Sequence, residues 1–279
     1  MDKRAAYDSI IAKVTKGELA FPTSAQLALK LRQTLDDPDC HMDDVTRLVQ
    51  AEPLLAARVV AIANSVVYNR SGQQISDVRQ AVVRLGLRTV RTQAMALVAR
   101  QMAGQPAGAA QQALASRLWE HTAYVAALAH MIARHVTHQD PETALFAAIV
   151  HEIGGFYLIS CADAYPGLID DDFSDWMESG EAAVGRAVLD VLGVPETVAS
   201  AMQGYWDGYL ALPPVSLADT LLLAEELAPV ASPLHHLHEE QPNPGRAAEI
   251  EMVIGKEKLS SILAEAADEV SSLTEALKT

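Results

Sequence analysis

Apolar residues recur at helical spacing along almost the whole chain, and this pattern constrains the fold more than any other feature. Leu27, Leu31 and Leu35, for example, repeat every four residues and form one apolar stripe. Alanine, the best helix former, supplies 47 of the 279 residues, whereas the aromatic residues that favour strands make up only 5%. No segment has a convincing strand pattern. The sequence therefore predicts an all-α fold and argues against an all-β sandwich or barrel.

Prolines, glycines and capping residues mark where the expected helices begin and end. We expect helices over residues 42–50, 53–64, 76–85, 87–102, 111–136, 141–152, 181–192, 195–205, 215–227 and 256–277. Gly154 and Gly155 are expected to break the helix that begins at Pro141. Residues 229–245 contain four prolines and three histidines, which predicts an exposed loop in which His235, His236 and His238 are solvated.

The segment 104–108 reads Gly-Gln-Pro-Ala-Gly and is the clearest linker in the chain. It divides the sequence into an N-terminal helical subdomain (1–105), a second helical subdomain (106–230), and a loop with a C-terminal helix (231–279). Charge changes at the same place. Residues 1–110 carry 14 Lys and Arg against 10 Asp and Glu (net +4), whereas residues 111–279 carry 7 against 26 (net −19). This asymmetry predicts two parts that attract each other and argues against a uniformly basic nucleic-acid-binding protein.

Arg84, Arg88 and Arg91 fall at i, i+4 and i+7 if one helical phase continues through Gly86. One interpretation is an anion site for a phosphate, a nucleotide or an RNA backbone. The other is that these arginines pair with the acidic second half and hold the two parts together. The absence of interleaved aromatic residues argues against base stacking.

Two cysteines, Cys40 and Cys161, are too few for a disulfide scaffold or a four-cysteine zinc site, which favours a reducing compartment. The N-terminus has no apolar signal-peptide core, and no run approaches the ~18 uninterrupted apolar residues of a membrane span. We therefore expect a cytoplasmic protein with no membrane partner.

Several short motifs, in their order and spacing, resemble one family. They read FPT (21–23), QAEPLLAARV (50–59), AIANS (61–65), AVVRLGLR (81–88), LWEH (118–121) and AAIVHEIG (147–154). Together they resemble the HDOD domain, a bacterial relative of the HD phosphohydrolases, over roughly residues 21–228. The resemblance implies an N-terminal helical bundle packed on a degenerate HD-type helical bundle.

The resemblance also implies a set of metal ligands, because HD enzymes bind divalent metal through a histidine, a His-Asp pair and a later aspartate. The matching positions are His121, His151, Glu152 in place of the aspartate, and Asp219. Two departures argue against a working dinuclear hydrolase: glutamate is longer than aspartate, and Tyr205-Trp206 stands where related sequences usually show a His-His pair. Indole cannot ligate a metal. The alternative for the two histidines is a hydrogen-bonded pair retained for packing.

These observations favour a non-catalytic signalling or regulatory module acting through protein–protein contact, with a small ligand in the degenerate site as an option. No catalytic residue is assigned. Family resemblance points to partners in two-component or cyclic-dinucleotide systems and leaves a homodimer open. The alternative is a metal-dependent phosphohydrolase of nucleotides or cyclic dinucleotides, which would need iron, manganese, zinc or magnesium; otherwise no cofactor is expected. A third hypothesis, nucleic-acid binding through the arginines, would require an affinity that falls steeply with salt.

Overall fold

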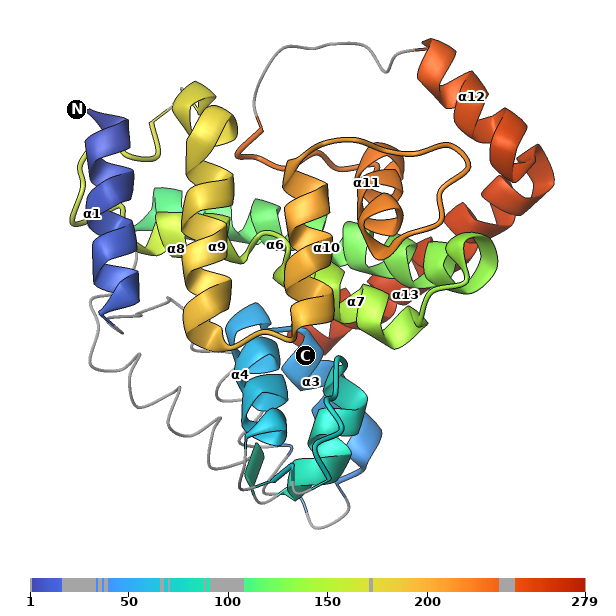
Figure 1. Cartoon of the computed structure of the whole chain (residues 1–279), viewed down its shortest axis with the longest axis horizontal. Coiled ribbons are helices and arrows are strands. Elements are labelled where there is room, and N and C mark those ends of the chain that lie inside the picture. The colour runs from blue at the N-terminus through green and yellow to red at the C-terminus, as the bar shows by residue number, and fades with distance from the viewer. Residues whose placement is uncertain are drawn as a thin grey trace.

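A computed structural model of the chain describes residues 2–16, 34, 37, 40–65, 68–69, 71–87, 89–90, 108–170, 173–235 and 244–278. All regular elements in this part are helical (Figure 1). They are α1 (Lys3–Thr15), α3 (Met42–Gln50), α4 (Pro53–Asn64), α6 (Ala109–Ile132), α7 (Pro141–Val150), α8 (Ile153–Ser160), α9 (Glu181–Leu192), α10 (Glu196–Trp206), α11 (Leu217–Leu227), α12 (Pro244–Ile254) and α13 (Lys256–Lys278), with π-helical turns η1 (Ala133–Thr137) and η2 (Trp176–Gly180). Residues 78–87 form another helix. The all-α prediction is confirmed.

Local start and stop signals explain why the predicted boundaries are close to the observed ones. Helices α3, α4 and α9 begin and end at the predicted residues. Pro53 lies in the first turn of α4, where a missing N–H costs nothing, and Glu52 caps that turn by accepting from the Leu55 N–H. Helix α7 repeats this arrangement: Pro141 follows Asp140, whose carboxylate accepts from the Thr143 N–H at 2.7 Å.

Three helices, α1, α8 and α12, were not predicted from the sequence. The expected break at Gly154 and Gly155 is wrong, because both glycines lie in the first turn of α8 and the interruption falls at His151 and Glu152. A Cβ on Gly154 would lie 2.9 Å from the Gly185 backbone of α9. Gly154 therefore allows two helices to approach closely and does not end one.

The helices α6 and α7 form the centre of the fold, with α11 and α13 packed on α6 and with α10 on α11. Helix α8 packs against α9, and α1 lies beside α9 although the two are far apart in the sequence (Figure 1). Arg4 of α1 forms ion pairs with Asp175 at 3.1 Å and with Glu178 at 2.5 Å. These contacts join a cation of the N-terminal half to acidic residues of the second half, as the charge asymmetry predicts.

One contiguous hydrophobic core includes side chains from both halves, from Ile10 in α1 to Ile262 in α13. The predicted boundary at residue 105 lies outside the described residues, so the division into subdomains stays a prediction. One stretch, Pro141–Ser160, is long and apolar enough to cross a membrane, but 83% of its most apolar window is buried inside the fold. Phe146 in this stretch is completely buried, as expected of a core helix.

Candidate functional site

The candidate site centres on two histidines whose side chains neighbouring helices bring into contact. His121 lies on α6, and His151 follows the last residue of α7. Their Nε2 atoms are 3.2 Å apart, and their rings are 5.3 Å apart between centroids. Both residues are almost completely shielded from solvent, with exposures of 0% and 2%. Helix packing therefore creates a polar site within an apolar core.

The partners of the Nδ1 atoms define the tautomer of each ring. His121 Nδ1 lies 2.8 Å from the Val230 carbonyl oxygen, and His151 Nδ1 lies 2.6 Å from the Ala148 carbonyl oxygen. A carbonyl can only accept, so each Nδ1 donates a proton to it. In the neutral form, both Nε2 atoms then present their lone pairs to the same point, as imidazoles do when they ligate metal.

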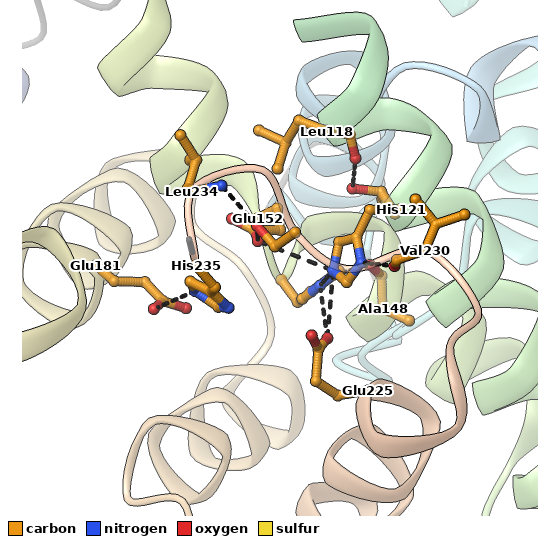
Figure 2. A network of polar contacts seen from close by, with 12 residues as sticks. Leu118, His121, Ala148, Glu152, Glu181, Glu225, Val230, Leu234 and His235 are labelled. Carbon is orange, nitrogen blue, oxygen red and sulfur yellow. Dashed lines mark hydrogen bonds and ion pairs between the residues drawn. The ribbon is translucent and has the colours of Figure 1, made fainter. Parts of the chain in front are cut away.

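Helix α11 supplies a carboxylate to this point, that of Glu225, shown below His121 in Figure 2. Glu225 Oε2 lies 3.3 Å from His121 Nε2 and 3.7 Å from His151 Nε2. Burial lowers the pKa of His121, but its hydrogen bond to Glu225 and the negative charge of that residue outweigh burial and raise the pKa to about 9. For Glu225 the effects have the opposite sign. Burial raises its pKa, but the hydrogen bonds to the two histidines and their charge outweigh burial and hold that pKa well below its usual range. The cluster thus favours ionised carboxylate.

Glu152, directly after His151, adds a second carboxylate. Its Oε1 accepts a hydrogen bond from Ser232 Oγ at 2.6 Å and lies 3.9 Å from His121 Nε2. Its Oε2 is buried and has no hydrogen-bond partner among the described residues. Gly155 leaves room for it, because a Cβ there would lie 2.8 Å from Glu152 Oε2. A buried carboxylate oxygen without a donor is a position that a cation can stabilise.

Residues 228–235, which we call the strap, cross the site after α11 ends (Figure 2). Val230 and Ser232 hydrogen bond to His121 and Glu152 as described above, and Leu234 is completely buried. His235 Nε2 lies 2.9 Å from Glu181 Oε2 of α9. The prediction of an exposed loop is therefore wrong for this part of 229–245, because its side chains fill and close the site. His236 and His238 lie outside the described residues.

Tyr205 closes another side of the cluster. Its ring meets that of His151 edge to face at 5.7 Å, and its hydroxyl donates to Glu225 Oε2 at 3.4 Å. Trp206 points elsewhere and packs against Gly185 and Arg186 of α9. The tyrosine therefore covers the site.

Asp219 is not among the residues that the structure brings to the histidines. It lies in the first turn of α11, where its carboxylate accepts from the backbone N–H groups of Ala211, Val215 and Ser216 and from the Ser216 hydroxyl. Burial raises the pKa of Asp219, but these donors outweigh it and lower that pKa. The described group that could hold a metal ion comprises His121, His151 and Glu152.

The arginine candidates divide between described and undescribed residues. Arg84 donates to the carbonyl oxygens of Ala63 at 3.2 Å and Gln73 at 3.1 Å, and so joins α4 to the loop after it. Arg88 and Arg91 lie outside the described residues, and the anion site stays a prediction. Neither described contact of Arg84 reaches the acidic second half, which here pairs with Arg4 instead.

Sequence reasoning missed Glu225, Ser232 and the closing role of the strap. Glu225 lies six residues after Asp219 on α11, next to Glu226, and no motif points to it. A consistent helical phase could have placed Glu225 on the inward face, since Leu221 and Ala224 of the same helix are buried. Ser232 has no such signal, because its contact depends on the path of an irregular segment.

The donor set suits a divalent transition metal. Two imidazole Nε2 atoms and carboxylate oxygens are ligands that zinc, iron and manganese accept, and each imidazole is oriented by a second hydrogen bond. The unpartnered Glu152 Oε2 is consistent with this fit. His121, His151 and Glu152 would hold the ion, with Glu225 beside them. A bound ion would neutralise buried negative charge and, given an open position, could activate water.

The all-helical fold and the buried group of His121, His151 and Glu152 agree with the HD-type bundle that the sequence motifs led us to expect. The sequence profile of the HDOD domain matches residues 21–206, and the chain belongs to this family. No protein of curated function matches it.

Solved structures share the fold at low sequence identity. A candidate metal-dependent phosphohydrolase from Shewanella amazonensis matches with a TM-score of 0.52 and 18% identity, covering 97% of this chain and 98% of that one. The response regulator MmoQ from Methylococcus capsulatus matches with a TM-score of 0.60 and 19% identity, covering 88% and 98%. Similarity at this level establishes the fold and leaves the activity open.

Proposed function

We propose that the chain is a non-catalytic HDOD regulatory module that acts through contact with other signalling proteins. The observation that carries this proposal is the closure of the His121–His151 cluster. Both histidines and Glu152 are buried, Tyr205 covers one side, and the strap crosses another. A phosphate ester needs a cleft that brings its phosphorus to the ligands, whereas this arrangement leaves only the Glu225 side chain partly exposed, at 25%.

The surface hollows of the molecule support the same reading. Two hollows among the described residues lie at α9, one towards α10 and the other towards α1, and neither is lined by a member of the cluster. One relative of the same fold is named a response regulator, which is compatible with a role in signalling. A two-component or cyclic-dinucleotide pathway is the setting that we propose.

The rival function is a metal-dependent phosphohydrolase. It is favoured by the three grouped ligands His121, His151 and Glu152 and by the name of the Shewanella relative. It requires an open coordination position and a path for substrate. We place it second because Tyr205 and the strap occupy the space around the ligands.

A turnover screen separates the two functions. Tag-free protein loaded with manganese, iron or zinc is incubated with cyclic dinucleotides, nucleotides and a nitrophenyl phosphate ester, with His151→Asn as the matched control. We expect the two proteins to release product at the same background rate. Multiple turnovers by the wild-type protein that disappear in His151→Asn would refute the non-catalytic proposal.

The regulatory part needs its own measurement. Chemical cross-linking in the source organism, followed by purification of this chain, is expected to yield a complex with a signalling protein that persists on reconstitution from pure components. Failure of the purified partner to bind would contradict the proposal.

A further inference from the structure

We infer that Glu225 of α11 completes, with His121, His151 and Glu152, a closed site for one divalent transition-metal ion, and that this site fastens α11 and the strap to α6 and α7. The inference deepens the proposed function, since it makes the site a structural lock and not a reaction centre. The inference depends on metal binding, whereas the proposed function depends on the absence of turnover, so either can fail without the other.

The first argument is the spacing of the donor atoms. The two Nε2 atoms are 3.2 Å apart, and Glu225 Oε2 is 3.3 Å and 3.7 Å from them. Ligand atoms that share a tetrahedral ion at the usual zinc–nitrogen distance of about 2.0–2.1 Å lie about 3.3 Å from one another. Three donors from three helices thus already have the separations of one coordination sphere. Glu152 Oε1 lies 3.9 Å from His121 Nε2, and Glu152 groups with the two histidines.

The second argument is the orientation of the lone pairs. Since both Nδ1 atoms donate to backbone carbonyls, two neutral imidazoles cannot hydrogen bond to each other through Nε2. Their contact is favourable only if a proton or a metal ion lies between the lone pairs. The carbonyl partners orient the rings in the way that outer-shell contacts orient metal-bound histidines.

The third argument is charge. Glu152 and Glu225 place two carboxylates beside the histidines, and a metal ion bound to His121 would take the place of the proton that Glu225 favours there. The neighbouring His235 is paired with Glu181, and its charge also acts on Glu152 and Glu225. A divalent cation neutralises the cluster, whereas buried unpaired charge is costly. The partly exposed Glu225 side gives the ion a route to the histidines.

The ligand count separates a lock from a reaction centre. Catalytic zinc sites keep one position for water or substrate, whereas structural sites are closed by four protein ligands. With Glu225 as the fourth ligand of a tetrahedral zinc ion, no position remains for a substrate. The mixed imidazole and carboxylate set favours zinc, iron or manganese over magnesium, which prefers oxygen ligands and retains waters.

The lock would act on the segment that follows Glu225. Glu225 lies two residues before the end of α11 at Leu227, after which the strap reaches His121 and Glu152 through Val230 and Ser232. Fixing Glu225 to the histidines therefore fixes α11 and the strap together. Loss of the ion is expected to loosen both while α6 and α7 stay packed.

Metal stoichiometry in two carboxylate variants tests the inference. Wild type, Glu225→Gln and Asp219→Asn are stripped with chelator, checked for folding by circular dichroism, and titrated with cobalt and zinc. We expect wild type and Asp219→Asn to bind about one ion per chain with the visible absorption of cobalt bound to nitrogen and oxygen. Glu225→Gln should bind at least about 100-fold more weakly, since the loss of even an outer-shell partner costs 10- to 100-fold.

Hydrogen exchange supplies a readout independent of affinity. Zinc should slow exchange in residues 217–235 of the wild type and of Asp219→Asn, and should leave Glu225→Gln unchanged. The inference is overturned if folded wild-type protein binds no ion, if Glu225→Gln binds as tightly as wild type, or if Asp219→Asn loses as much affinity as Glu225→Gln. Metal-dependent turnover with Glu225-dependent binding would instead overturn only the non-catalytic function.

Discussion

Replacing Gly154 by alanine tests whether the contact between α8 and α9 holds the site region together. The added Cβ would lie 2.9 Å from both the Cα and the N of Gly185. Real Cβ contacts are ordinarily 3.4 Å or longer, so the two helices would have to separate by about half an ångström. Because the obstructing atoms belong to a backbone, no side-chain rotation can relieve the clash.

Two opposing effects set the magnitude. Alanine in a helix is favoured over glycine by about 0.5–1 kcal/mol. Overpacking a well-packed contact costs about 1–3 kcal/mol. The clash dominates, and we expect Gly154→Ala to reduce the free energy of unfolding by about 1–2 kcal/mol. At about 2–4 °C per kcal/mol for a chain of this size, the melting temperature should fall by roughly 2–8 °C.

Gly155→Ala is the matched control, because it makes the same change one residue along the same helix. The atoms nearest to its Cβ would be the ends of the Leu234, Glu152 and Leu118 side chains and not a backbone. We therefore expect a smaller loss of stability in Gly155→Ala than in Gly154→Ala. Thermal and urea unfolding followed by circular dichroism measure both. A Gly154→Ala protein as stable as the wild type would refute the argument from close backbone approach.

Three further predictions concern other parts of the molecule. Asn64 accepts from the Ile75 N–H at 2.8 Å and donates to the Ile75 carbonyl at 2.7 Å, so Asn64→Ala should destabilise the fold by about 1–3 kcal/mol in urea unfolding, and an unchanged midpoint would contradict this role. Burial lowers the pKa of His235, but its pair with Glu181 raises it to about 10, above the unfolded value of 6.5. Wild type should therefore be more stable than His235→Gln by about 1.5–3 kcal/mol. This difference should be complete below pH 6.5 and should disappear as the pH rises through 10. A flat difference over that range would count against the ion pair. Removing metal with a chelator should lower the melting temperature of the wild-type protein, and returning zinc should restore it; identical melting curves would exclude a bound ion from the fold.

Much of the architecture could be predicted because it depends on short-range signals. A helix start needs only a capping carboxylate followed by proline, as in Glu52-Pro53 and Asp140-Pro141, and this signal acts wherever it occurs in a chain. The same reasoning misread Gly154, because a glycine that ends a helix and one that admits a neighbouring helix look identical in sequence. Only the position of α9 distinguishes them.

The candidate site was predicted in part. His121, His151 and Glu152 could be placed by motif, and the structure brings these three together. The motif also pointed to Asp219, whose carboxylate is used by the first turn of α11. The carboxylate that faces the histidines comes from Glu225, nearly two helical turns further on, and which turn faces inward depends on how α11 lies against α6.

The sequence by itself therefore determined the fold class, the boundaries of helices such as α3, α4 and α9, and the histidine pair, because helical periodicity, capping and motif spacing are properties of neighbouring residues. Tertiary structure alone decided that Glu225 joins the histidines, that the strap covers them and that α1 packs on α9. Those outcomes depend on contacts between residues distant in the chain. Their free energy comes from burying shared surface and satisfying buried polar groups, which no local pattern records.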